Sequence, residues 1–187
     1  MKHKYYAEYK NIKLRPLEEK DIEQLRIWRN DLRTTRFLRP IGQITKEMQV
    51  QWFENYIKDD EQIIFAIDEI SELNRMVGSL ALYDLKPNSD TCEIGKIQIG
   101  DLEAHGKGIG RCSFVMAMKI AVEKLNIKNF VAEVHRDNIA ARTNYFKIGF
   151  RIIGEQLSVA GGIEDKIEIT AEELRNINYY NNIKITK

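Results

Sequence analysis

A short glycine-rich stretch precedes an apolar segment in the middle of the chain. Residues 105–110 read HGKGIG, so three of the 11 glycines fall within six positions, and Arg111 and the run CSFVMAMKIAV follow. Glycine lets the backbone approach a ligand closely and adopt conformations that side chains forbid. The first N–H groups of a helix, aided by the helix dipole, bind anions. The stretch therefore predicts a phosphate-binding loop at the start of a helix.

Two common phosphate-binding patterns do not fit this loop. The P-loop pattern GxxxxGK[ST] fails, because Gly108 follows Gly106 and Lys107 where the pattern needs Ser or Thr. No glycine lies five positions before Gly106 either. The dinucleotide fingerprint GxGxxG fails as well, since its third glycine would fall on Arg111 or Ser113. That fingerprint also belongs after the first strand of a repeated βαβ unit, which is not the order predicted here.

A second segment with chemically useful side chains lies downstream. Residues 138–150 read NIAARTNYFKIGF. At helical spacing, Asn138, Ala141, Tyr145 and Ile148 fall on one face. The segment therefore predicts a helix that presents an amide, a small methyl group and a phenol to the same neighbour.

Together the two segments resemble the GCN5-related N-acetyltransferases (GNAT). HGKGIG resembles the family's pyrophosphate loop [Q/R]xxGxG/A, with His105 in place of the usual Gln or Arg. Residues 138–150 match the family's NxxAxxxYxKxGF signature at the distance downstream that the family shows. The close resemblance covers residues 93–154. A weaker one covers residues 14–31, LRPLEEKDIEQLRIWRND, which are similar to the ribosomal-protein N-terminal acetyltransferases and their amino-sugar-acetylating relatives.

The resemblance implies an acyltransferase that moves an acetyl group from acetyl-CoA to a primary amine, by direct attack of the amine on the thioester. The acceptor is left open between a protein N-terminus, an amino sugar and another small amine. Two alternatives remain at this point. One is a non-catalytic domain that binds acyl-CoA, and the other, less favoured, is a dinucleotide-binding oxidoreductase.

Acetyl transfer of this kind needs a base and an acid, and two residues are candidates. An alkyl amine has a pKa of about 10.4, so removing its proton at pH 7 costs about 4–5 kcal/mol. Glu93 opens the strand CEIGKIQIG and is the candidate base, directly or through a water. Simple alternation places Glu93 on the same face as Ile97 and Ile99, unless a bulge interrupts the strand. Tyr145 is the candidate acid, because its protonated phenol can donate to the leaving thiolate.

The resemblance also implies which residues hold the cofactor. Ile97, Gln98 and Ile99 would hold the pantetheine arm through the backbone of a splayed strand and supply an oxyanion donor. Asn138 would meet the cofactor from the downstream helix. No metal is expected. The predicted pyrophosphate loop consists of His105, Gly106, Lys107, Gly108, Ile109, Gly110 and Arg111.

These residues need a layered α+β (mixed α/β) scaffold to bring them together. The resemblance implies a GNAT-like fold with a central, mostly antiparallel, splayed sheet of about seven strands and about four flanking helices. One domain, 1–187, is expected, with a poorly ordered tail over about 175–187. Hydrophobic periodicity predicts helices over 18–31, 45–58, 109–125 and 139–148. Strands are expected over 11–17, 63–69, 76–85, 92–100, 130–134, 150–153 and 166–170.

The first two predicted helices supply candidates for the acceptor site. The aromatic residues Trp28, Phe37, Trp52 and Phe53 lie where the family builds its acceptor wall, although aromatic residues at helical spacing are more often core. Arg29 and Asn30 could contact substrate, but a solvated face is the favoured interpretation.

The composition of the chain limits the classes of molecule that it is expected to bind. The chain has 187 residues, 43% hydrophobic and 30% charged, with a formal net charge of +1, which is typical of a globular protein. No concentrated basic footprint indicates nucleic-acid binding. No run of 18 apolar residues or signal-peptide core is present, and Cys92 and Cys112 have no CxxC spacing. We expect a cytoplasmic protein without a membrane partner; a homodimer is left open.

Overall fold

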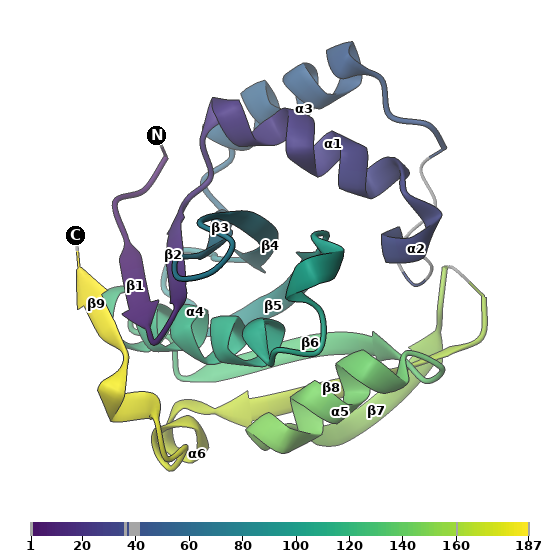
Figure 1. The fold of residues 1–187 in the computed structure, drawn as a ribbon. Coiled ribbons are helices and arrows are strands. Elements are labelled where there is room, and N and C mark those ends of the chain that lie inside the picture. The colour runs from purple at the N-terminus through teal and green to yellow at the C-terminus, as the bar shows by residue number, and fades with distance from the viewer. Residues whose placement is uncertain (1, 36, 38–41, 160, 187) are drawn as a thin grey trace.

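The computed structural model describes residues 2–35, 37, 42–159 and 161–186. Within these residues one nine-stranded sheet runs in the order β7-β8-β6-β5-β4-β3-β2-β1-β9 (Figure 1). Every neighbouring pair is antiparallel except β5 and β6, which are parallel. The strands are β1 (Tyr6–Tyr9), β2 (Ile12–Pro16), β3 (Ile63–Glu69), β4 (Arg75–Tyr83), β5 (Thr91–Ile99), β6 (Asn129–His135), β7 (Arg151–Leu157), β8 (Ile163–Thr170) and β9 (Lys184–Thr186).

Helices cover both faces of the sheet. Figure 1 shows α1 and α3 over one face and α4 and α5 against the other. Thr45 caps the N-terminus of α3, because its hydroxyl accepts the N–H of Met48 at 3.2 Å. α5 ends at Gly149 in the left-handed region, with φ 116°. The helices are α1 (Ile22–Asn30), α2 (Leu32–Thr35), α3 (Lys46–Lys58), α4 (Ile109–Leu125), α5 (Ile139–Ile148) and α6 (Ala171–Arg175).

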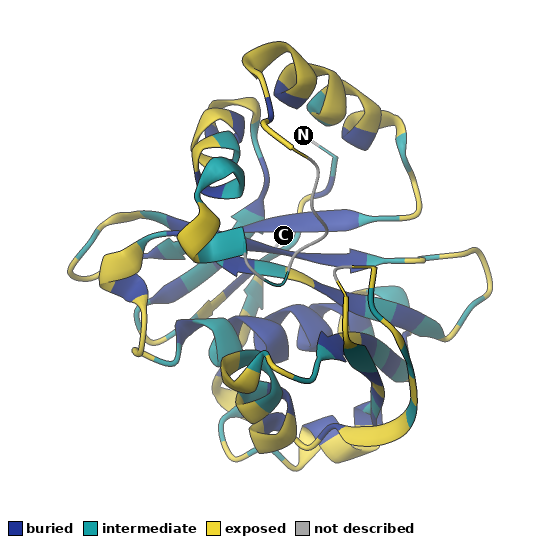
Figure 2. Cartoon of the chain, turned by 90° about the vertical axis from the view of Figure 1, so that its right-hand side faces the viewer, coloured by how far each residue is buried: buried dark blue, intermediate teal, exposed yellow. Residues whose placement is uncertain are grey.

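Two hydrophobic cores form, one on each face. The larger core packs α4 against the sheet, and Phe114, Met116 and Met118 are almost fully buried in it. The smaller core lies under α1 and α3 and includes Trp28 and Tyr56. In Figure 2 the buried residues follow the strands and the helix sides that face them. None of the helices in the described part of the chain has the length and hydropathy to cross a bilayer.

The α+β fold, with its mixed and mostly antiparallel sheet, is the one that the sequence predicts. The described residues form nine strands and six helices, against about seven and four expected, because β1, β9 and the short α2 and α6 were not foreseen. Residues 175–186, most of the tail that the sequence predicts to be poorly ordered, are described in the structure. β9 pairs antiparallel with β1 at the edge of the sheet, and Tyr180 and Ile183 are 4% exposed. Burial of these apolar side chains holds a segment whose many asparagines indicated disorder.

Gly100, directly after β5, lets α1 lie close to the sheet. A Cβ on Gly100 would lie 2.0 Å from the ring of Trp28, which is 6% exposed. No side chain other than hydrogen fits there without displacing the indole and, with it, α1. Gly100 therefore fixes the distance between α1 and the end of β5.

We expect Gly100→Ala to lower the free energy of unfolding by about 1–3 kcal/mol, the usual cost of overpacking a core. Gly154→Ala is the matched control, because its Cβ would meet nothing within 4 Å. Urea denaturation of the two variants measures the difference. Equal midpoints for Gly100→Ala and Gly154→Ala would contradict the close packing of Trp28.

Candidate active site

The sheet opens where β5 leaves β6. In the described structure their parallel pairing covers three residue pairs, from Thr91 with Asn129 to Glu93 with Val131. Beyond that point β5 stays paired with β4 as far as Ile99, and β6 stays paired with β8 as far as His135. The two strands therefore diverge after Glu93, and the second half of β5 has one edge with no neighbouring strand. This is the splayed geometry that the sequence resemblance implies.

The backbone of β5 offers hydrogen-bonding groups at this open edge. The N–H of Gly100 donates to Val77 on the β4 side at 3.0 Å. Because backbone groups alternate along a strand, those of Ile99 and Ile97 point to the opposite edge. The ring Nε2–H of His105 donates to the carbonyl of Ile99 there, at 2.8 Å. The open edge at Ile97 and Ile99 suits a pantetheine arm, which carries amide groups; Gln98 contributes to the other edge.

A bulge in β5 corrects the expected face of Glu93. Ser79 pairs with Gln98, but Ala81 pairs with Gly95, so β5 contains one extra residue between these pairs. Lys96 takes a left-handed φ of 49° in this interval. The extra residue reverses the alternation. Glu93 therefore shares a face with the side chain of Gln98, toward α1 and α3, and not with Ile97 and Ile99.

The glycine loop builds the N-terminus of α4. Gly106 and Gly108 have φ of 75° and 74°, which favours glycine over any other residue. Gly108 is the N-cap residue, and the first helical bond runs from the N–H of Cys112 to its carbonyl, at 3.1 Å. The N–H groups of Ile109, Gly110 and Arg111 consequently have no partner within the helix. N–H groups at the positive end of a helix dipole can bind an anion, so these three groups make a candidate anion site.

The anion site and the open edge of β5 are adjacent. A Cβ on Gly110 would lie 3.4 Å from Cδ1 of Ile97 and 3.6 Å from Cγ1 of Ile99. The side chain of Lys107 is turned toward the β3–β4 turn, where its ammonium lies 2.9 Å from Oε2 of Glu72. Arg111 lies back over the loop, with Nη2 3.9 Å from where a Cβ of Gly108 would be. The residues therefore fit a ligand whose diphosphate joins an amide-containing arm, as in acetyl-CoA.

Asn138 begins α5 and has a structural role that the sequence prediction did not include. Its Oδ1 accepts the N–H of Ala141 at 3.1 Å, which makes it the N-cap. The side-chain NH₂ of Asn138 is the group left for a cofactor contact. That contact stays a prediction.

Glu93 is the last residue of β5 that pairs with β6, and its charge acts on the phenol of Tyr145. Burial raises the pKa of Glu93, and the hydrogen bond that Tyr83 donates to it opposes this rise. Tyr145 is 3% exposed, with its ring centroid 4.8 Å from that of Phe114 and 5.1 Å from that of Phe150. Burial raises the pKa of Tyr145, and the charge of Glu93 raises it further. A raised pKa makes the Glu93 carboxylate a stronger base, and it keeps the Tyr145 phenol protonated. These are the states that the proposed roles of base and acid require.

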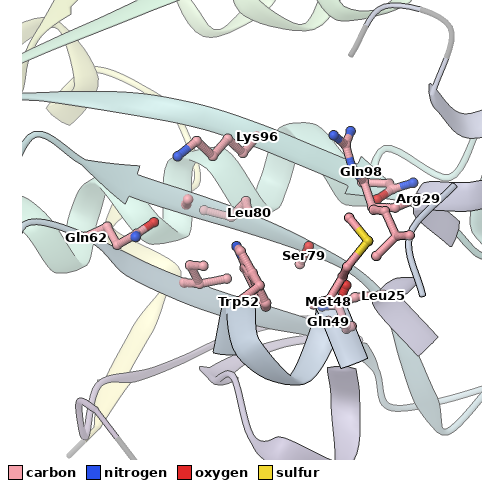
Figure 3. A pocket seen from close by; sticks show the side chains of 13 residues that line it. Leu25, Arg29, Met48, Gln49, Trp52, Gln62, Ser79, Leu80, Lys96 and Gln98 are labelled. Atoms are coloured by element: carbon pink, nitrogen blue, oxygen red, sulfur yellow. The ribbon is translucent and has the colours of Figure 1, made fainter. Parts of the chain in front are cut away.

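A cavity of about 480 Å³ opens on the α1/α3 side of the sheet (Figure 3). Its walls are largely apolar, with Leu25, Met48, Trp52 and Leu80 among them. The polar side chain of Gln98 reaches it from beyond the bulge. The cavity lies on the face of the sheet to which Glu93 belongs.

Of the aromatic residues proposed for the acceptor wall, only some line this cavity in the described structure. Trp52 is 37% exposed and lines the cavity, whereas Trp28 is core. Phe53 packs against the same small core, and Phe37 lies 5.4 Å from the ring of His135. Neither is among the described residues that line the cavity.

The sequence favours a solvent-exposed helix face for Arg29 and Asn30, and this prediction was wrong. Arg29 is half-buried and lines the cavity. The Asn30 amide accepts the N–H of Ile44 at 2.8 Å and donates to its carbonyl at 2.9 Å. It thereby fixes the segment that leads into α3. Helical spacing gave no sign of either contact, because both depend on how α1 and α3 pack together.

Sequence reasoning also missed Tyr83 and Lys96. Tyr83 donates to Glu93, and the ammonium of Lys96 lies 4.2 Å from the centroid of the Tyr83 ring. The sequence near Tyr83 and Lys96 carries one hint of this arrangement. It is Gly95, since a glycine inside a strand often marks a bulge.

Known proteins share this fold. A family profile described as "Acetyltransferase (GNAT) domain" matches residues 11–151. An N-acetyltransferase 9-like protein of Nematostella vectensis is 24% identical over 155 residues, 77% of this chain and 76% of that protein. Spermidine N-acetyltransferase from Vibrio cholerae, solved with CoA and spermine, superposes with a TM-score of 0.79 at 19% identity, covering 89% of this chain and 99% of that one. A domain from Methanocaldococcus jannaschii DSM 2661 gives 0.71 at 25% identity, covering 85% and 97%.

The chain belongs to the GNAT acetyltransferase family. It is an acyltransferase with acetyl-CoA as the donor, as the two sequence motifs predict. The comparisons do not assign the ribosomal-protein or amino-sugar branch, and the individual site residues stay predictions.

We expect Tyr83→Phe to move the acidic limb of the kcat/KM–pH profile to higher pH. The bond from Tyr83 stabilises the carboxylate and lowers the pKa of Glu93, so its loss raises that pKa further. A base works only when ionised, and activity at pH 6 should therefore fall more than activity at pH 8. Tyr5→Phe, near the N-terminus, is the control. An unchanged acidic limb in Tyr83→Phe would show that Glu93 is not the titrating base.

Proposed function

We propose that the protein acetylates a primary amine by direct attack on the acetyl-CoA thioester, with Glu93 as base and Tyr145 as acid. One observation carries the proposal. Glu93 is the last residue of β5 that pairs with β6, its charge acts on Tyr145, and the open edge of β5 that follows lies against the glycine loop at Gly110. The continuous sheet supports a single acetyltransferase domain for the chain.

The donor would bind on the α4 side. Acetyl-CoA supplies the acetyl group as an activated thioester. The N–H groups at the start of α4 would hold its diphosphate, and Arg111 would add a positive charge there. The backbone of Ile97 and Ile99 would orient the pantetheine arm along the edge of β5. An N–H group of that edge would also stabilise the oxyanion that develops during attack.

The acceptor would arrive from the other face. The cavity on the α1/α3 side leads to the face of β5 that carries Glu93. Glu93 would accept the proton that the amine loses, directly or through a water, as the nitrogen attacks the thioester carbon. Its raised pKa supports this role, because a more basic carboxylate accepts a proton more readily.

Tyr145 would donate to the departing sulfur. Its burial and the charge of Glu93 keep the phenol protonated throughout the neutral range. The ring is fixed between Phe114 and Phe150, so the hydroxyl has a defined position. A positioned donor of this kind favours catalysis over binding alone, and we therefore prefer an enzyme to a non-catalytic acyl-CoA-binding domain.

The proposal also concerns which class of amine accepts the acetyl group. The structural neighbour from Vibrio cholerae is a spermidine N-acetyltransferase by name, which supports an amine acceptor. Residues 14–31 resemble enzymes that act on protein N-termini and amino sugars. A primary amine is the acceptor chemistry that these proteins share.

We expect Tyr145→Phe to lower kcat by about 10²- to 10⁴-fold, the usual contribution of a general acid. The KM for acetyl-CoA should change little, because the change removes only a hydroxyl and the packing on Phe114 and Phe150 persists. Steady-state kinetics measured by CoA release test this, with the buried Tyr180→Phe as control. Wild-type kcat in Tyr145→Phe would refute the acid role. A raised KM with unchanged kcat would instead assign Tyr145 to cofactor binding.

A further inference from the structure

Two buried polar side chains on the wall of the cavity have no partner within the described protein. Gln49, from α3, and Ser79, from β4, are 6% and 8% exposed, and both line the cavity (Figure 3). Neither the Gln49 amide nor the Ser79 hydroxyl forms a hydrogen bond with a residue that the structure describes. The described polar atoms that are sealed in the core without a partner belong to other residues, so these two groups stay open to the cavity. Only a molecule inside the cavity can satisfy them.

Gln98 adds a third group at the same place. It pairs with Ser79 across β5 and β4, so the two side chains are neighbours on one face of the sheet. The hydroxyl of Thr34 donates to the carbonyl of Trp28 at 2.6 Å, and its oxygen therefore accepts from the NH₂ group of Gln98, at 2.9 Å. That bond fixes the amide and leaves its Oε1 for the cavity, because no described residue donates to it.

The hydrogen-bonding capacity of the three groups matches a hydroxyl. The Oε1 of Gln98 only accepts, whereas the Ser79 hydroxyl and the Gln49 amide both donate and accept. One hydroxyl of a ligand can therefore donate to Gln98 and accept from Ser79 at the same time, and another can pair with Gln49. An ionised carboxylate has no proton to donate to Gln98, and an ammonium group cannot accept from Ser79.

The surfaces between these groups are apolar. Met48 and Trp52, which are 46% and 37% exposed, line the same cavity. A thioether and an indole provide contact area for C–H groups. The cavity of about 480 Å³ is of a size typical of small-molecule sites. It suits a compact body with apolar C–H surfaces and several hydroxyl groups.

The three groups lie next to the strand that would hold the donor. Gln98 stands between Ile97 and Ile99, whose backbone at the open edge is proposed to orient the pantetheine arm, and Ser79 lies opposite Gln98 on β4. A molecule that binds Ser79 and Gln98 is consequently on the acceptor side of β5.

We propose that Gln49, Ser79 and Gln98 bind hydroxyl groups of the acceptor, and that the acceptor is a compact primary amine with several neutral hydroxyls, as in an amino sugar. An amine without hydroxyls would leave the three buried groups unpaired in the complex, which a site of this kind rejects strongly. This proposal rests on the function proposed above and specifies its acceptor.

Acceptors that differ in their hydroxyl groups test the proposal. The panel contains amino-deoxyhexoses with the amine at different ring positions, and cyclohexylamine, which keeps the six-membered ring and the amine. Spermidine and alaninamide represent polyamines and peptide N-termini. Because these amines differ in pKa, kcat/KM is expressed per concentration of unprotonated amine. We expect the best amino-deoxyhexose to exceed the other three amines at least tenfold. A smaller difference, or a preference for any of those three, overturns the proposal.

Variants locate the hydroxyl-binding groups. We expect Gln49→Met and Ser79→Ala each to lower kcat/KM for the best amino-deoxyhexose at least tenfold, mainly through its KM. The kcat/KM for cyclohexylamine and the KM for acetyl-CoA should change little. The melting temperature should stay equal or rise, because no hydrogen bond within the described protein is lost.

Gln51→Met is the matched control for Gln49→Met, since Gln51 lies on the same helix, is exposed and contacts Glu54 and Asn55. It should leave all these values unchanged. Should Gln49→Met not fold, Ser79→Ala makes the same test independently. Equal losses with the amino-deoxyhexose and with cyclohexylamine, or a lowered melting temperature with unchanged acceptor preference, would contradict hydroxyl binding by these residues.

The outcomes separate this proposal from the proposed function. CoA release with a preference for cyclohexylamine, spermidine or alaninamide overturns the hydroxyl-bearing acceptor and leaves the acetyltransferase function standing. Absence of CoA release with every amine, when calorimetry shows that acetyl-CoA binds, overturns both.

Discussion

A β-strand alternates its side chains between the two faces of a sheet, and the extra residue in β5 reverses this alternation. Before the bulge, Glu93 faces α1 and α3. After it, Ile97 and Ile99 turn to α4, and Gln98 turns to the cavity. A single strand thus directs a carboxylate to the α1/α3 side of the sheet and its later apolar residues to the α4 side. Without the bulge, Glu93 and the residues against α4 would lie on one face.

The divergence of β5 from β6 is the second half of this arrangement. It frees the edge of β5 next to the start of α4, just after Glu93, whose charge acts on Tyr145 in the larger core. In the proposed mechanism the two substrates bind on opposite faces of the sheet and meet at this opening.

The sequence predicted those features that depend on local patterns. The glycine loop at a helix start, the face shared by Asn138 and Tyr145, and the α+β layers follow from spacing and motif. The bulge did not, because Lys96 stands in an unbroken strand pattern with only Gly95 as a hint. Contacts between distant segments, such as Asn30 with Ile44 and Tyr83 with Glu93, could not be read from spacing. The polar composition of the tail indicates poor order, whereas the structure places Tyr180 and Ile183 in the core.

The most direct test of this account is a crystal structure of the chain with CoA bound. The account predicts the diphosphate against the N–H groups of Ile109 to Arg111 and the pantetheine amides paired with the backbone of Ile97 and Ile99. The sulfur should lie in the opening between β5 and β6, within reach of the Tyr145 hydroxyl and open to the cavity side. CoA bound elsewhere, or a sulfur separated from Tyr145 and from the cavity by the intact sheet, would contradict it.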